Sequence, residues 1–86
     1  MKRDFDYYIG VAEDAHKRSD GLWTLMNGLI AEVLRTGKKR GRTLKETADA
    51  LDYIAGPRKK AQAVVAIENL RVAAKRIREG EELTLL

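Results

Sequence analysis

Apolar residues recur at steps of three and four along most of the chain, which is the spacing of amphipathic helices. The pattern divides into four helical segments, at about residues 4–18, 20–36, 43–55 and 57–79. Nowhere do apolar and polar residues alternate for long enough to indicate a strand. The sequence therefore predicts an all-α fold, a small bundle of four helical segments that forms one domain over residues 1–86.

Residues that cap helices mark the expected starts of these segments. Asp4 or Asp6 is expected to cap the first helix, and Asp20 offers a cap for the second. Thr43 and Glu46 stand three residues apart before an apolar run, which is the spacing of a capping box. The third helix is therefore expected to begin directly after Thr43.

Glycines mark the expected ends. Gly37 is expected to end the second helix in the left-handed conformation, and Gly80 to end the fourth. Gly56 and Pro57 separate the third helix from the fourth, since proline fits the first turn of a helix and disrupts its interior. With so short a connection, we expect the third and fourth helices to form an antiparallel hairpin.

The second segment is the most hydrophobic, and its apolar residues cover about half of the helix circumference. One interpretation makes it the central helix of the bundle. The other assigns part of its apolar stripe, Trp23 in particular, to an interface with a second copy or another protein. The composition alone is compatible with both.

The fourth segment has a coiled-coil-like seam that includes Leu70 and Ile77, and Val65 and Val72 project nearly opposite this seam. These two valines either pack under the N-terminal helix or form a partner or self-association surface. The third helix is too short, at about 18 Å, to cover the fourth, at about 33 Å. The second helix or another subunit must cover the remainder, which favours a dimer. The leucines after residue 80 are likewise expected to dock on the bundle or on another subunit.

The net charge of +4 is unevenly distributed along the chain. Residues 1–34 carry four basic side chains against six acidic ones, whereas residues 35–80 carry thirteen against five. A basic second half points to an anionic partner, and a cluster of cations on a loop can contact phosphates and release counterions. The segment Gly37–Arg42, expected to be a flexible loop, is the strongest candidate; its alternative interpretation is a solvated surface that keeps the protein soluble. The predicted nucleic-acid-binding residues are Lys38, Lys39, Arg40, Arg42, Arg58, Lys59 and Lys60.

The chain offers little for catalysis or metal binding. It has no cysteine and one histidine, His16, which is expected to be structural because no nucleophile accompanies it. Asp49 and Asp52 share a helix face but lack a phosphate-binding glycine loop beside them. Residues 43–51 resemble the first helix of a helix-turn-helix, but Asp52 stands where the turn glycine is expected. We therefore expect no enzyme activity, cofactor or metal.

These observations favour a small non-enzymatic regulatory protein whose basic second half contacts nucleic acid. The alternative is an inhibitor or adaptor that binds a host protein through apolar helix faces, without nucleic acid. In its style, short, cysteine-free, helical and rich in charge, the chain is similar to small accessory proteins of phages and mobile elements, although no motif carries the likeness. No apolar run is long enough to span a membrane and no signal peptide is evident, so a cytoplasmic location is expected.

Overall fold

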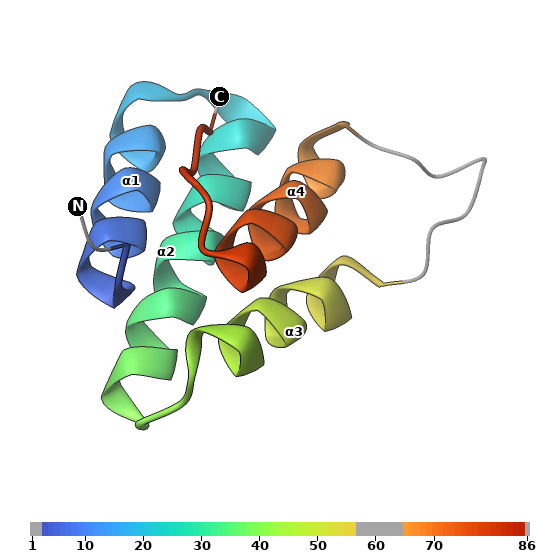
Figure 1. Cartoon of the computed structure of the whole chain (residues 1–86). Helices are drawn as coiled ribbons and strands as arrows, with labels where there is room; N and C mark the ends of the chain where they lie inside the picture. Colours follow the sequence, from blue (N-terminus) through green and yellow to red (C-terminus); the bar gives the residue numbers. More distant parts are fainter. Residues whose placement is uncertain (1–2, 57–64, 86) are drawn as a thin grey trace.

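The computed structural model describes residues 3–56 and 65–85, and in these residues the chain forms four helices (Figure 1). They are α1 (Phe5–Arg18), α2 (Gly21–Lys39), α3 (Leu44–Ala55) and α4 (Val65–Glu79). The predicted all-α class is therefore confirmed. Residues 57–64, where the fourth helix was expected to begin, lie outside the described residues.

Helix starts follow the local capping chemistry. The Asp4 side chain accepts a hydrogen bond from the Tyr7 backbone N–H at 3.0 Å, so Asp4 is the cap of α1. Thr43 and Glu46 form the predicted capping box, in which each side chain accepts the other residue's backbone N–H, at 3.0 and 2.8 Å. Asp20 precedes α2 as predicted but makes no capping hydrogen bond with its side chain.

The predicted end of α2 at Gly37 is wrong. Gly37 lies inside the helix and is buried, and the helix continues for two more residues to Lys39. The left-handed residue is Gly41, with φ of 70°. Its N–H donates to the Lys38 carbonyl and the Arg42 N–H donates to the Gly37 carbonyl, at 3.2 and 2.9 Å, which is the pattern of a Schellman turn.

Gly37 is needed for a close helix crossing rather than for a turn. A Cβ atom at this position would collide with the side-chain hydroxyl of Thr47 in α3 and would lie 3.4 Å from the Phe5 ring. The glycine thus lets α2 meet both α1 and the start of α3. Gly80, by contrast, ends α4 as predicted, with φ of 68° and the hydrogen bonds of a second Schellman turn.

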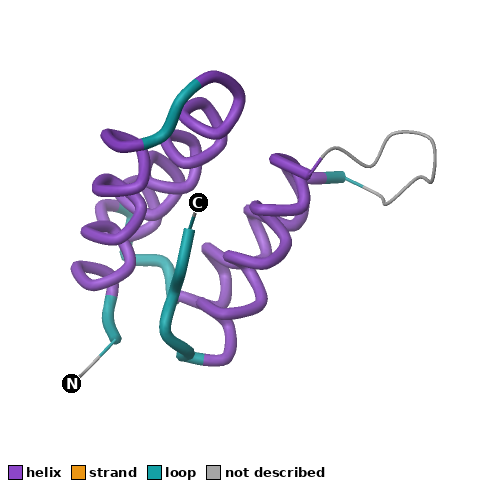
Figure 2. Tube along the Cα trace, turned by 90° about the horizontal axis from the view of Figure 1, so that it is seen from above, coloured by secondary structure: helices purple, strands orange, loops and turns teal. Residues whose placement is uncertain are grey.

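The helices pack as two antiparallel pairs, α1 with α2 and α3 with α4 (Figures 1 and 2). The second pair is the predicted hairpin, and α2 contacts both of its helices. The segment after α4 runs back in extended form between α1 and α4 (Figure 2). No helix among the described residues is long and apolar enough to cross a membrane. The largest fully buried apolar side chains are Tyr8, Ile30, Leu34, Leu51 and Ile77, with Leu70 2% exposed.

On α4 the predicted seam is buried, but one polar residue joins it. Asn69 is a polar residue, yet it is only 8% exposed. Its side-chain amide donates to the Asn27 carbonyl oxygen at 2.9 Å, and the Asn27 amide donates to the Ser19 hydroxyl at 3.2 Å. Buried amides require hydrogen-bond partners, and these two find them in each other and in Ser19. The resulting network connects α4 to α2 and to the α1–α2 turn.

Candidate functional site

The predicted basic loop is a short hydrogen-bonded turn between two helices, and its first cations belong to α2. Lys38 and Lys39 lie in the last turn of α2, and the Schellman turn around Gly41 fixes the backbone of Arg40 and Arg42. The chain then enters α3 through its capping box within two residues. The cations are therefore presented by ordered backbone, which lowers the entropy lost on binding an anion.

Lys38 differs from the neighbouring cations because it forms an ion pair within the fold. Its ammonium group donates to the Asp6 carboxylate of α1, and this hydrogen bond raises the pKa of Lys38. Lys38 therefore contributes little unneutralised charge, although the sequence placed it among the nucleic-acid-binding residues.

Lys39, Arg40 and Arg42 are exposed and make no ion pair with any residue of segments 3–56 and 65–85. Lys45, in the first turn of α3, is also exposed and likewise unpaired within those segments. We call these four residues the basic corner. Glu46 stands beside it, and the hydrogen bonds from Thr43 lower the pKa of that carboxyl group.

Among the described residues of the second half, most cations outside the corner form ion pairs or hydrogen bonds within the fold. Arg35 bridges Glu13 of α1 and Glu32 of its own helix, at 2.6 and 2.8 Å. Arg78 of α4 bridges two carboxylates of α3, and these hydrogen bonds raise its pKa. The basic charge predicted along α4 is thus partly neutralised, and within residues 3–56 and 65–85 the unpaired cations are concentrated at the corner.

Arg71 has a structural role that the sequence did not reveal. Its guanidinium donates to the backbone carbonyls of Ala55 and Gly56, at 3.2 and 2.7 Å, and pairs with Glu68. The last carbonyls of a helix have no partners within the helix, so Arg71 satisfies the end of α3 from the neighbouring α4. No local signal marks this contact because it joins residues 15 and 16 positions apart.

Arg58, Lys59 and Lys60, the predicted extension of the basic patch, lie outside the described residues. The described chain reaches Gly56, at the far end of α3 from the corner. A helix of 12 residues is about 18 Å long, so Gly56 lies about that distance from the corner. The described residues therefore form the corner without this extension.

The predicted partner residues occupy different environments. Val65 is 68% exposed and Val72 is 43% exposed, so neither packs under the N-terminal helix. Trp23 is half-buried near the start of α2. On the same helix, Leu22 and Leu25 are exposed, Leu25 to 64%, although Trp23 was the predicted contact residue. A hollow beside Val72 is lined by Lys75, Arg76 and Glu81 as well.

The remaining candidates for chemistry have structural partners. A ring nitrogen of His16, Nδ1, lies 2.8 Å from the Thr24 carbonyl oxygen. Asp49 and Asp52 both accept from Arg78, at 2.8 and 2.6 Å. Within residues 3–56 and 65–85, no group of three or more His, Cys, Asp or Glu side chains is arranged to hold a metal ion.

Comparison with known proteins finds no matching family, no similar curated protein and no similar solved structure. The function must therefore be inferred from the residues of the chain itself.

Proposed function

We propose that the protein is a small non-enzymatic regulatory protein that binds nucleic acid through the phosphate backbone. The observation that carries this proposal is the basic corner, where Lys39, Arg40, Arg42 and Lys45 are exposed on ordered backbone. Guanidinium and ammonium groups bind phosphate oxygens, and the release of counterions drives such binding without sequence specificity. The pairing of Arg35, Lys38 and Arg78 with carboxylates supports the corner as the contact region.

Charge-removing substitutions test the corner directly. In Arg40→Gln/Arg42→Gln, two phosphate contacts are lost, and we expect affinity for a random-sequence DNA duplex to fall by about tenfold or more at low salt. Fluorescence anisotropy with a labelled duplex measures this change. The same titration with single-stranded DNA and RNA identifies the preferred nucleic acid.

The matched control is Lys17→Gln/Lys75→Gln, which removes the same charge from exposed positions outside the corner. We expect this control to change affinity by less than about threefold. Equal losses in the two variants would show that net charge alone drives binding, and would exclude the corner as the contact region.

The second candidate function is an inhibitor or adaptor that binds a protein without nucleic acid. It is favoured by the exposed apolar side chains of Leu22 and Leu25 on α2, since solvated leucines in one helical turn are typical of contact surfaces. Affinity capture with and without nuclease separates the two candidates. A captured protein that is retained after nuclease treatment and lost in Leu25→Glu supports the second candidate.

A further inference from the structure

The segment after α4, residues Glu81–Leu85, is bound to the bundle in extended form. Leu83 and Leu85 are buried, whereas Glu82 and Thr84 are exposed, which is the alternation of an extended chain on a surface. Leu83 and Leu85 belong to the hydrophobic core cluster. This C-terminal segment therefore contributes apolar side chains to the core in the way a bound peptide would.

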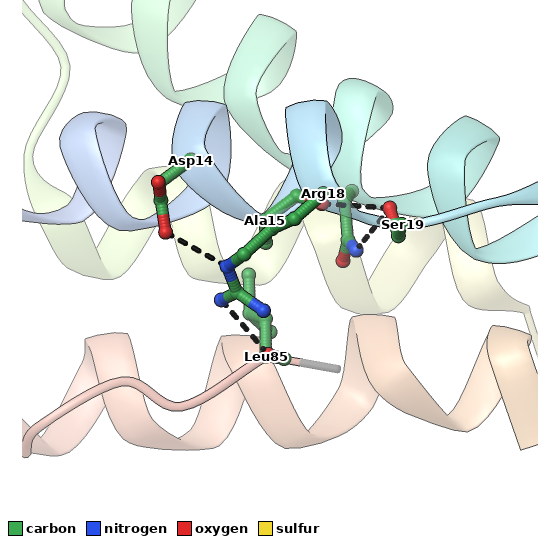
Figure 3. A network of polar contacts seen from close by, with 6 residues as sticks. Asp14, Ala15, Arg18, Ser19 and Leu85 are labelled. Atoms are coloured by element: carbon green, nitrogen blue, oxygen red, sulfur yellow. Dashed lines mark hydrogen bonds and ion pairs between the residues drawn. The ribbon is translucent and has the colours of Figure 1, made fainter.

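Most of the polar contacts of the C-terminal segment are made with α1. Tyr8 donates its hydroxyl to the Glu81 carbonyl at 2.7 Å, and the Leu83 N–H donates to the Tyr7 hydroxyl at 3.2 Å. Arg18, which also pairs with Asp14, donates to the Leu85 carbonyl at 3.3 Å (Figure 3). The side chains of α1 thus hold the backbone of a segment 67 to 76 residues away.

The connection between α4 and this segment is a single left-handed glycine, Gly80. The local bonds across it are few: the Glu81 N–H donates to the Arg76 carbonyl at 2.8 Å, and the Arg76 side chain donates to the Glu82 carbonyl at 3.2 Å. A change of φ and ψ at Gly80 is therefore the backbone movement that would carry the segment away from α1. It would also withdraw Leu83 and Leu85 from the core, so another segment would have to take their place.

We propose that the C-terminal segment is exchanged between two copies of the chain, so that each copy docks residues 81–85 on α1 of the other. The second copy is the occupant because every copy carries both the segment and the α1 surface that holds it. Exchange reproduces the same contacts and needs no new complementary surface, which makes it a low-cost route to a dimer. This proposal is independent of the proposed nucleic-acid binding.

Gly80→Ala tests the hinge in the full-length chain. An alanine in the left-handed conformation is strained, whereas it favours continuing α4 as a helix, so it disfavours the closed monomer. We expect the association constant for dimerisation to rise by about tenfold or more, measured by analytical ultracentrifugation from micromolar to millimolar concentrations. Gly80→Asn is the matched control, because asparagine tolerates the left-handed conformation and should change association much less.

A pair of complementary variants shows which surfaces form the dimer. Tyr7→Phe/Tyr8→Phe weakens the α1 surface, and Leu85→Ala weakens the segment. Each variant, made in the Gly80→Ala background where the monomer is open, should lower the association constant for dimerisation, because only the dimer then contains the contact between the segment and α1. Circular dichroism identifies variants that fail to fold, and Leu85→Val is the milder substitute. A folded Gly80→Ala variant that stays monomeric at millimolar concentration would overturn the exchange. So would a Gly80→Ala dimer whose association constant does not change when the α1 or Leu85 substitutions are added, because in that background the monomer is open and only the dimer makes these contacts.

Discussion

Two glycines show how the same residue type serves different purposes at neighbouring positions. Gly41 adopts a left-handed φ in the turn after α2, whereas Gly37 is helical and lies where α2 meets Thr47. Sequence alone favours the first glycine after an apolar helical run as its end. The choice between them depends on which position contacts another helix, and local patterns carry no such information.

The crossing at Gly37 predicts a stability difference between two helical glycines. Gly37→Ala is expected to lower the free energy of unfolding by about 1–3 kcal/mol, because the added methyl collides with Thr47. Gly10→Ala is the control: nothing lies within 4 Å of a Cβ there, and alanine favours the helix by about 0.5–1 kcal/mol. Urea denaturation measures both. Equal stabilisation by the two substitutions would contradict the close crossing.

At the scale of elements, the starts of α1 and α3 follow from sequence because capping acts over three residues. Thr43 with Glu46 therefore identifies the start of α3 directly, and Asp4 was one of two candidates for the cap of α1. Contacts between elements are harder to predict. The burial of Asn69 depends on its hydrogen bond with Asn27, which is 42 residues away, so no local pattern indicates that this polar side chain is buried.

The α3–α4 hairpin predicts unequal roles for two arginines. Arg71 is 16% exposed and satisfies helix-end carbonyls, so Arg71→Ala should cost about 2 kcal/mol of stability, largely unaffected by salt. Arg78 is more exposed, and Arg78→Ala should cost at most about 1 kcal/mol, with a loss that shrinks as salt screens its ion pairs. Thermal denaturation at 50 mM and 500 mM salt measures both losses. A larger loss for Arg78→Ala would contradict this assignment.

The contact between α1 and the C-terminal segment predicts a pH dependence. Burial raises the pKa of Tyr8 above its ordinary value of 10.0. The folded state therefore holds the phenolic proton more tightly than the unfolded state, and this stabilisation is complete below pH 10 and lost as pH rises above it. As the pH rises from about 9 to about 11, the free energy of unfolding of the wild type should therefore fall relative to that of Tyr8→Phe, which has no phenolic proton to lose. A difference that stays constant over this range would exclude the predicted linkage.

At the scale of the whole molecule, the charge asymmetry of the sequence is partly cancelled by folding. Acidic side chains of α1, among them Asp6 and Glu13, pair with Lys38 and Arg35 of α2. The sequence placed the candidate site at the α2–α3 junction and included Lys38 in it. The ion pair of Lys38 with Asp6 could not be predicted, because Asp6 belongs to a helix distant in sequence. Among the described cations of that junction, the four residues of the basic corner remain unpaired.

Salt dependence of nucleic-acid binding by the wild-type protein tests the central claim most directly. If three of the four cations of the corner contact phosphates, the logarithm of the association constant should fall with the logarithm of salt concentration at a slope of about −2.7. Affinity for a random duplex would then drop about 40-fold between 50 and 200 mM salt. Absence of binding at 50 mM salt, or binding that does not change with salt, would contradict phosphate recognition by the corner.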